Sequence, residues 1–194
     1  MDQLAYYRQP PHVLPRFGDF MFKMLLRANT MQYLFQYQDH PPMCVYCGSN
    51  ETYMHFLLSC SYGQSVWHYF KQVQHILGCS FPRNGLELFF DVPKPIDGYY
   101  VRGFLKIWPI IRACVYYQIW LQRNDRTFRP DLTAKDPLAI AIRAANLIKI
   151  HLHQLLEDLS IKKGFSKVFN LLRRLSIDPW LKTYMIPESV QDIQ

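Results

Sequence analysis

The sequence is poor in acidic residues, with 15 Asp and Glu against 22 Lys and Arg, so its formal net charge is +7. All charged residues together make up 19% of the chain, which is below the usual share of about a quarter. Because the cations themselves are not unusually numerous, the net charge alone is weak evidence for nucleic-acid binding. The composition is that of a globular protein and excludes collagen-like, coiled-coil and wholly disordered chains.

Long hydrophobic runs are also missing. The longest apolar stretch, residues 104–121, is interrupted by two cations, a proline and a glutamine, and is too short and too polar to span a bilayer. The first fifteen residues contain an acid, an arginine and three prolines, unlike a signal peptide or an amphipathic presequence. We therefore expect an intracellular protein, nuclear or cytoplasmic, without membrane contact. In that compartment its five cysteines should be reduced or metal-bound.

Catalytic motifs are absent as well. Polymerases and nucleases cluster carboxylates around two metal ions about 4 Å apart. Here the acids are scattered, and the one adjacent pair, Glu157-Asp158, is expected to be solvated at a helix end. The sequence has no Tyr-x-Asp-Asp, P-loop, Gly-x-Ser-x-Gly or HExxH motif. It therefore predicts a protein that is not an enzyme.

Apolar residues recur at helical spacing along most of the chain, which predicts a mostly α fold. The expected helices cover about residues 17–35, 61–77, 100–125 and 137–159. The third is apolar nearly all round and should be a central core helix, which Pro109 either starts or kinks. Asp136-Pro137 and Asp178-Pro179 are acid-then-proline helix starts, Ser166 should cap a shorter basic helix, and Gly78 should end the second helix.

The predicted organisation has five parts. They are an irregular arm (1–16), a zinc-binding helical module (17–78), a loop (79–99), a helical bundle region that packs with the module (100–185) and a tail (186–194). Within the loop, residues 86–90 could form a short helix or an edge strand.

Four metal-binding side chains lie within seventeen residues, namely Cys44, Cys47, His55 and Cys60. Their spacing, C-x2-C-x7-H-x4-C, offers the four soft or borderline donors that zinc takes in a tetrahedron. Gly48 permits a tight turn after the second cysteine, and His55 is expected on a short helical segment that begins near residues 50–51 and ends at Cys60. Since no coordination position is left open, the spacing predicts a structural Zn²⁺ in a small CCHC knuckle between the first two helices.

Other interpretations of these residues stay open. Cys44 and Cys47 alone could form a thioredoxin-like redox pair, although that motif belongs in a βαβ context that this sequence does not show. The thiols could also be a chance cluster in the core. His55 is the least specific ligand, and His40 and His68 are the nearest substitutes. The two remaining cysteines are interpreted as a loop residue and a core residue.

Four segments of the chain carry a resemblance to a known family. They are F-x-x-F-M-F-K-M-L-L-R-A-N-T (17–30), M-C-V-Y-C-G-S-N-E-T-Y-M-H-F-L-L-S-C (43–60), S-V-W (65–67) and I-W-L-Q-R-N-D-R-T-F (119–128). The first three resemble the reverse-transcriptase zinc-binding domain, which follows the polymerase in many non-LTR retrotransposon proteins. The fourth is similar to the Trp-x-x-Arg-Asn element often found after that zinc site. The resemblance covers about residues 17–128.

The resemblance implies a non-catalytic, zinc-stabilised module that assists a reverse transcriptase in binding its RNA or target DNA. It assigns the same four zinc ligands, and it makes Trp67 a residue that packs against the site. It also implies descent from a retroelement, with a reverse-transcriptase core encoded upstream as a candidate partner.

The net charge comes from the second half of the chain. Residues 1–100 hold seven Lys/Arg and seven Asp/Glu, whereas residues 101–194 hold fifteen and eight. Two basic clusters are predicted to contact the phosphates of RNA or DNA: Arg123, Arg126 and Arg129, and then Lys162, Lys163, Lys167, Arg173 and Arg174. Phe128, Phe165 and Phe169 could stack on unpaired bases, or the last two could be core residues beside solvated cations.

The alternative hypothesis is a zinc-stapled helical scaffold that binds another protein, or a retroelement relic without a function. An aromatic content of 15% combined with low charge favours an exposed apolar patch, as such a scaffold would need.

Overall fold

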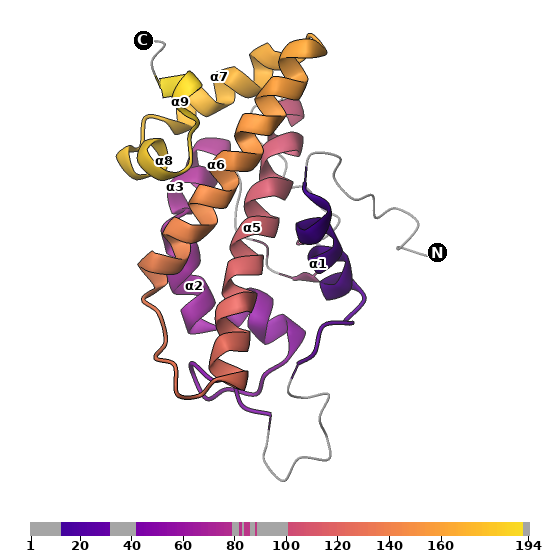
Figure 1. The fold of residues 1–194 in the computed structure, drawn as a ribbon, viewed down its shortest axis with the longest axis vertical. Helices are drawn as coiled ribbons and strands as arrows, with labels where there is room; N and C mark the ends of the chain where they lie inside the picture. Colours follow the sequence, from indigo (N-terminus) through magenta and orange to yellow (C-terminus); the bar gives the residue numbers. More distant parts are fainter. Residues whose placement is uncertain are drawn as a thin grey trace.

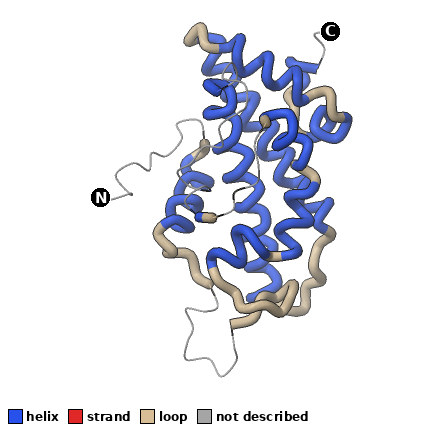
Figure 2. Tube along the Cα trace, turned by 180° about the vertical axis from the view of Figure 1, so that it is seen from behind, coloured by secondary structure: helices blue, strands red, loops and turns tan. Residues whose placement is uncertain are grey.

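The structure is a computed structural model that describes residues 13–31, 42–78, 82, 84, 85, 88 and 101–191. Across these residues the regular structure is almost entirely helical (Figure 1). The one β interaction is an isolated antiparallel bridge between Met43 and Asn50, and Figure 2 shows no strand in the part of the chain that is described. The predicted mostly α fold is therefore confirmed, with the Cys-His segment between the first two helices.

The helices follow one another in a simple order. They are α1 (Pro15–Leu25), the π-helical turn η3 (His55–Ser59), α2 (Ser61–His68), α3 (Lys71–Leu77), α5 (Val101–Phe128), α6 (Pro137–Ile161), α7 (Phe165–Leu175), α8 (Pro179–Tyr184) and α9 (Glu188–Gln191).

Helix α5 is the centre of the fold. It runs along the long axis of the molecule, with α1 on one side and α2 and α6 on the other (Figure 1). Phe104, Ile107, Ile111 and Val115 are completely buried, as the apolar pattern around this helix predicts. The helix continues through Pro109 and spans 28 residues.

A single hydrophobic core unites the two halves of the chain. Buried side chains of α1 and α2 belong to the same cluster as those of α5, α6 and α7. The Cys-His segment therefore rests on the bundle that the second half forms, and the two parts share one core.

The predicted first helix is too long. It ends at Leu25, because Arg27 adopts a left-handed conformation with φ 54°. The amide of Ala28 bonds to the carbonyl of Lys23 at 2.8 Å, and that of Arg27 bonds to Met24 at 3.1 Å, which closes the helix as a Schellman motif. The remainder of the predicted helix, residues 32–35, lies outside the described residues.

The predicted helix over residues 61–77 is divided in two. Tyr69 and Phe70 separate α2 from α3, and their amides bond three residues back, to Val66 and Trp67. This turn buries Phe70 fully in the core. Gly78 ends α3 with φ 62°, as predicted.

The acid-then-proline signals are confirmed. Asp136 accepts a hydrogen bond from the amide of Leu138, and Asp178 accepts one from Leu181, each at 2.8 Å. Ser166 is not the cap of the basic helix, because α7 begins at Phe165 after Gly164.

The predicted arm and tail are more ordered than expected where they are described. Pro15 already begins α1, and residues 188–191 form α9, which buries Val190. Most of the predicted loop, including most of residues 86–90, lies outside the described residues. Among the helices that are described, none combines the length and apolar composition needed to cross a bilayer.

Candidate metal centre and basic surfaces

The four predicted ligands converge on one point. One donor atom from each of Cys44, Cys47, His55 and Cys60 lies within 4.8 Å of all the others. The Sγ atoms of Cys44 and Cys60 are 3.8 Å apart, and Cys47 Sγ is 3.3 Å from His55 Nε2. Two sulfurs bound to one zinc ion at ~2.3 Å in a tetrahedron would be ~3.8 Å apart, so the spacing fits that geometry. These side chains could hold a metal ion.

The first cysteine pair sits on a tight turn. The amide of Cys44 donates to the carbonyl of Ser49 at 2.7 Å, and the amide of Gly48 donates to Cys44 at 3.0 Å. Gly48 has φ 68°, a conformation that costs other residues energy. The glycine is therefore required by the turn, as the sequence predicts.

The second ligand pair depends on the π-helical turn η3. Residues five apart on an α-helix point ~140° away from each other. In η3 the amide of Cys60 bonds to the carbonyl of His55 at 2.8 Å, and this wider turn brings both side chains to one side. Thr52 begins the segment, since its hydroxyl accepts the amide of His55 at 3.0 Å. The predicted short helical segment ending at Cys60 is therefore present, in a π-helical form.

The pKa values of the two buried cysteines are shifted in opposite directions. The hydrogen bond from Cys44 lowers the pKa of Cys60 to about 7, against the effect of burial, and the amides of Gly63 and Tyr62 lower it further. The same contact raises the pKa of Cys44 to about 12 and burial adds to this rise, while the amides of Tyr46 and Cys47 act in the opposite direction. Thiolate is the form that binds metal ions, so amides directed at both sulfurs suit a metal site.

Neighbouring side chains hold the ligands in place. Ser59 Oγ lies 3.4 Å from His55 Nδ1, which leaves Nε2 facing the cysteines. Tyr46 of the cysteine turn stacks on Tyr62 of α2, with ring centres 3.9 Å apart. The Tyr62 hydroxyl donates to the carbonyl of Lys135 at 2.7 Å. The knuckle is thus attached both to α2 and to the segment before α6.

A buried ion pair links the knuckle to α5. Arg123 donates through Nε and Nη2 to the two carboxylate oxygens of Glu51, at 2.8 and 2.5 Å. Both residues are 1% exposed. Arg123 also donates to the carbonyl of Thr30 at 3.2 Å and lies 5.1 Å from the ring centre of Trp120. We therefore remove Arg123 from the predicted nucleic-acid surface, because a buried guanidinium with these partners cannot meet a phosphate.

The other two arginines of the first cluster are also engaged. Arg126 donates to the carbonyls of Pro130 and Leu132 in the turn after α5. Arg129 pairs with Asp125 at 3.7 Å, although its side chain remains 68% exposed. The three arginines of this predicted cluster therefore make three different kinds of contact: a buried ion pair, hydrogen bonds to backbone carbonyls and a surface ion pair.

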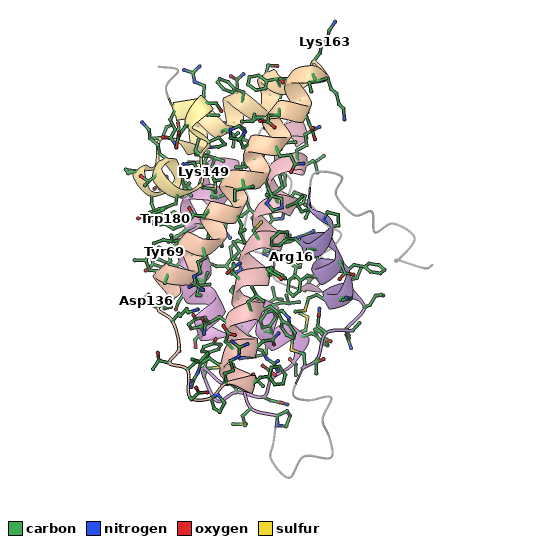
Figure 3. All side chains as sticks on the ribbon, in the orientation of Figure 1. Arg16, Tyr69, Asp136, Lys149, Lys163 and Trp180 are labelled. Carbon is green, nitrogen blue, oxygen red and sulfur yellow. The ribbon has the colours of Figure 1, made fainter. Side chains whose placement is uncertain are left out.

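The second basic cluster lies on the surface. Lys162, Lys163, Lys167 and Arg173 are exposed along and just before α7, and Arg174 is partly buried. Lys163 lies at one end of the molecule in Figure 3. Phe165 and Phe169 stack on each other with ring centres 4.8 Å apart and pack, half-buried, against the core.

The alternatives for individual residues are now clearer. His68 is exposed on α2 and is not part of the metal group, and His40 lies outside the described residues. Cys114 is a buried core residue, as predicted. Trp67 is also buried, but its ring neighbours are core aromatics, including Trp108 and Tyr116.

Sequence reasoning missed two supports of the site. Glu51 and Arg123 each stand in a segment that carries the family resemblance, but nothing in the sequence pairs them. The stack of Tyr46 on Tyr62 had no sequence signal.

Comparison with models of known families, with curated proteins and with solved structures found no match.

Proposed function

We propose that this chain is a non-catalytic accessory module of the kind found in retroelement reverse transcriptases, held together by a structural zinc ion and binding RNA or DNA. The observation that carries the proposal is the convergence of three thiols and one imidazole within 4.8 Å. With four protein donors, a zinc ion has no open position for a substrate or an activated water, so its role is structural.

Nucleic-acid binding is assigned to the surface of α7. Residues 159–177 contain five Lys or Arg and no Asp or Glu. The apolar face of this helix is buried through Val168, Leu171, Leu172 and Leu175, so its cations are held on a fixed surface. A rigid acid-free surface of this kind suits phosphate contacts, which dominate sequence-independent affinity for nucleic acids.

The zinc part of the proposal is tested by metal analysis of the purified full chain. We expect one zinc per chain, and loss of cooperative unfolding when a chelator removes it. The redox alternative for Cys44 and Cys47 predicts the opposite result: no stoichiometric zinc and a reversible disulfide.

The nucleic-acid part is tested by fluorescence anisotropy with a labelled single strand. We expect binding that weakens steeply between about 50 and 200 mM salt. Absence of binding by the folded, zinc-loaded chain would overturn this part of the proposal. It would also favour the protein-scaffold alternative, for which exposed Phe128, Ile161 and Ile177 supply apolar contact area.

A further inference from the structure

A groove runs along the outer face of α2 and α3. It consists of two adjoining hollows of about 480 and 610 Å³, which share His68 and Tyr69. Both hollows are open to solvent, so they suit a ligand that lies along the surface and not one that is enclosed. The groove is separate from the metal centre, none of whose ligands lines it.

The floor of the groove is a stripe of polar side chains. Ser61, Gln64, His68, Gln72 and His75 follow one another at intervals of three or four residues, so they share one face although the helix breaks at residues 69–70. These side chains are all exposed or partly exposed. The sequence contains no Asp or Glu from residue 52 to residue 86, so the floor carries hydroxyl, amide and imidazole groups without carboxylates.

The walls of the groove add hydrogen-bond acceptors. Asp136 stands at the start of α6, and Asp178 at the start of α8. Each uses Oδ1 for a backbone amide, and a carboxylate can accept about four hydrogen bonds, so both retain acceptor capacity. Figure 3 shows Trp180, Tyr69 and Asp136 one after another down this side of the molecule.

The aromatic wall is rigid but already occupied. Trp180 stacks on Tyr69 with ring centres 5.8 Å apart, meets Phe70 edge-on and lies 5.4 Å from Tyr184. These contacts fix the wall, since three aromatic neighbours surround the indole. The groove can therefore form hydrogen bonds with a ligand, but it has little free aromatic surface for stacking.

The groove begins where the basic helix ends. Asp178 and Trp180, which line the second hollow, follow α7 in the chain, and α7 itself packs against α3. A strand whose phosphates lie along the cations of α7 would thus reach the groove with its neighbouring nucleotides.

We propose that this groove binds the unpaired bases of a single-stranded nucleic acid whose phosphates are held by α7. Phosphate contacts position a strand, whereas donors and acceptors aimed at base edges distinguish bases from one another. The groove has both kinds of group, including carboxylates, which accept hydrogen bonds from the amino groups of bases. This inference rests on the nucleic-acid binding proposed above, and the groove is then a second contact surface beside α7.

The test compares two strands of equal length and charge, about 16 nucleotides long. One has a mixed base sequence, and the other is an abasic deoxyribose-phosphate strand. We expect the full, zinc-loaded chain to bind the base-bearing strand about tenfold more tightly, the effect of one or two good hydrogen bonds. The double variant His68→Ala/Gln72→Ala should lose this preference and leave the dependence of affinity on salt unchanged.

The matched control is His153→Ala/Gln154→Ala, which removes the same two residue types from the exposed face of α6, away from the groove. It should keep the tenfold preference. A second groove variant, Gln64→Ala/Ser65→Ala, changes the other hollow and should also reduce the preference for the base-bearing strand. It provides the test if the first variant does not fold.

The possible failures are distinguishable. If the unmodified chain binds both strands equally, or if both groove variants keep the preference, the groove proposal is overturned while nucleic-acid binding stands. If the unmodified chain binds neither strand, the proposed function fails and the groove proposal fails with it.

Discussion

The guanidinium of Arg123 meets the carboxylate of Glu51 at two points inside the protein, across a separation of 72 residues. Glu51 lies between the two pairs of candidate metal ligands, Cys44 with Cys47 and His55 with Cys60. A single bidentate contact therefore fixes both halves of the knuckle against α5. It also serves the segment after α1, because the same guanidinium bonds to the carbonyl of Thr30.

Breaking this pair should be costly. Glu51→Gln leaves the Arg123 charge buried without its counter-ion, and we expect a loss of ~3–5 kcal/mol in the free energy of unfolding. Denaturant unfolding at a fixed zinc concentration measures it. Replacing both partners by Glu51→Leu/Arg123→Met should restore most of the stability, since no buried charge remains.

The matched control is the surface pair of Lys149 and Glu188, whose charged atoms are 3.9 Å apart and whose Glu188 side chain is 84% exposed. Glu188→Gln should change stability by less than ~1 kcal/mol. An equal loss in both single variants would show that burial of the Arg123–Glu51 pair is not what matters.

The metal site should respond in graded fashion. Cys47→Ser removes a ligand and should abolish stoichiometric zinc binding. Ser59→Ala removes only the group beside His55 Nδ1 and should weaken zinc binding by ~10-fold. Competition with a chromophoric chelator measures both effects. Cys114→Ala is the control: it removes a buried thiol outside the site, so it should lower stability but keep one zinc per chain.

The two predicted basic clusters should differ in nucleic-acid binding. Lys162→Ala/Lys163→Ala and Arg126→Ala/Arg129→Ala each remove two positive charges. Only the first pair is free of the carbonyl and carboxylate contacts found at the end of α5. We expect the first variant to flatten the plot of log affinity against log salt by ~1.4, which corresponds to two phosphate contacts on a single strand.

The second variant should leave that slope nearly unchanged. Anisotropy titrations at several salt concentrations provide the comparison, and thermal unfolding checks that both variants are folded. If both variants flatten the salt dependence equally, Arg126 and Arg129 contact the nucleic acid as Lys162 and Lys163 do.

His151 should make the fold sensitive to acid. Burial lowers its pKa, against the bond of Nδ1 to the carbonyl of Leu147, and the charge of Arg16 lowers it further. Because the folded state resists protonation, stability is unaffected above the unfolded pKa of ~6.5. Below that pH the unfolded chain binds the extra proton, so stability falls as the pH drops towards the folded pKa.

The change attributable to His151 should be no steeper than ~1.4 kcal/mol per pH unit. His151→Leu removes the titrating group, so the unfolding free energy of the unmodified chain minus that of the variant should decrease as the pH falls from 7 to 5. Loss of a bound metal ion in acid would affect both proteins equally and would cancel in the difference. A constant difference would show that His151 does not contribute.

Local patterns were sufficient wherever one short segment holds all the determinants. The acid-then-proline starts at Asp136 and Asp178 and the left-handed Gly78 were all predictable, since each is decided within a few residues. The ends of helices were less predictable from the sequence. Arg27 adopts a left-handed conformation that its residue type disfavours, and the break at Phe70 follows from the burial of that ring in the core.

The sequence by itself determined the helical fold class and the four side chains that could hold a metal ion, because seventeen residues contain all four of these donors. Only the tertiary structure decided what each arginine of residues 123–129 does. Charge in a sequence does not reveal whether a side chain is exposed, and burial of Arg123 depends on Glu51, which is distant along the chain. The groove beside α7 is likewise a product of packing, since α2, α3, α6 and α8 all contribute to it.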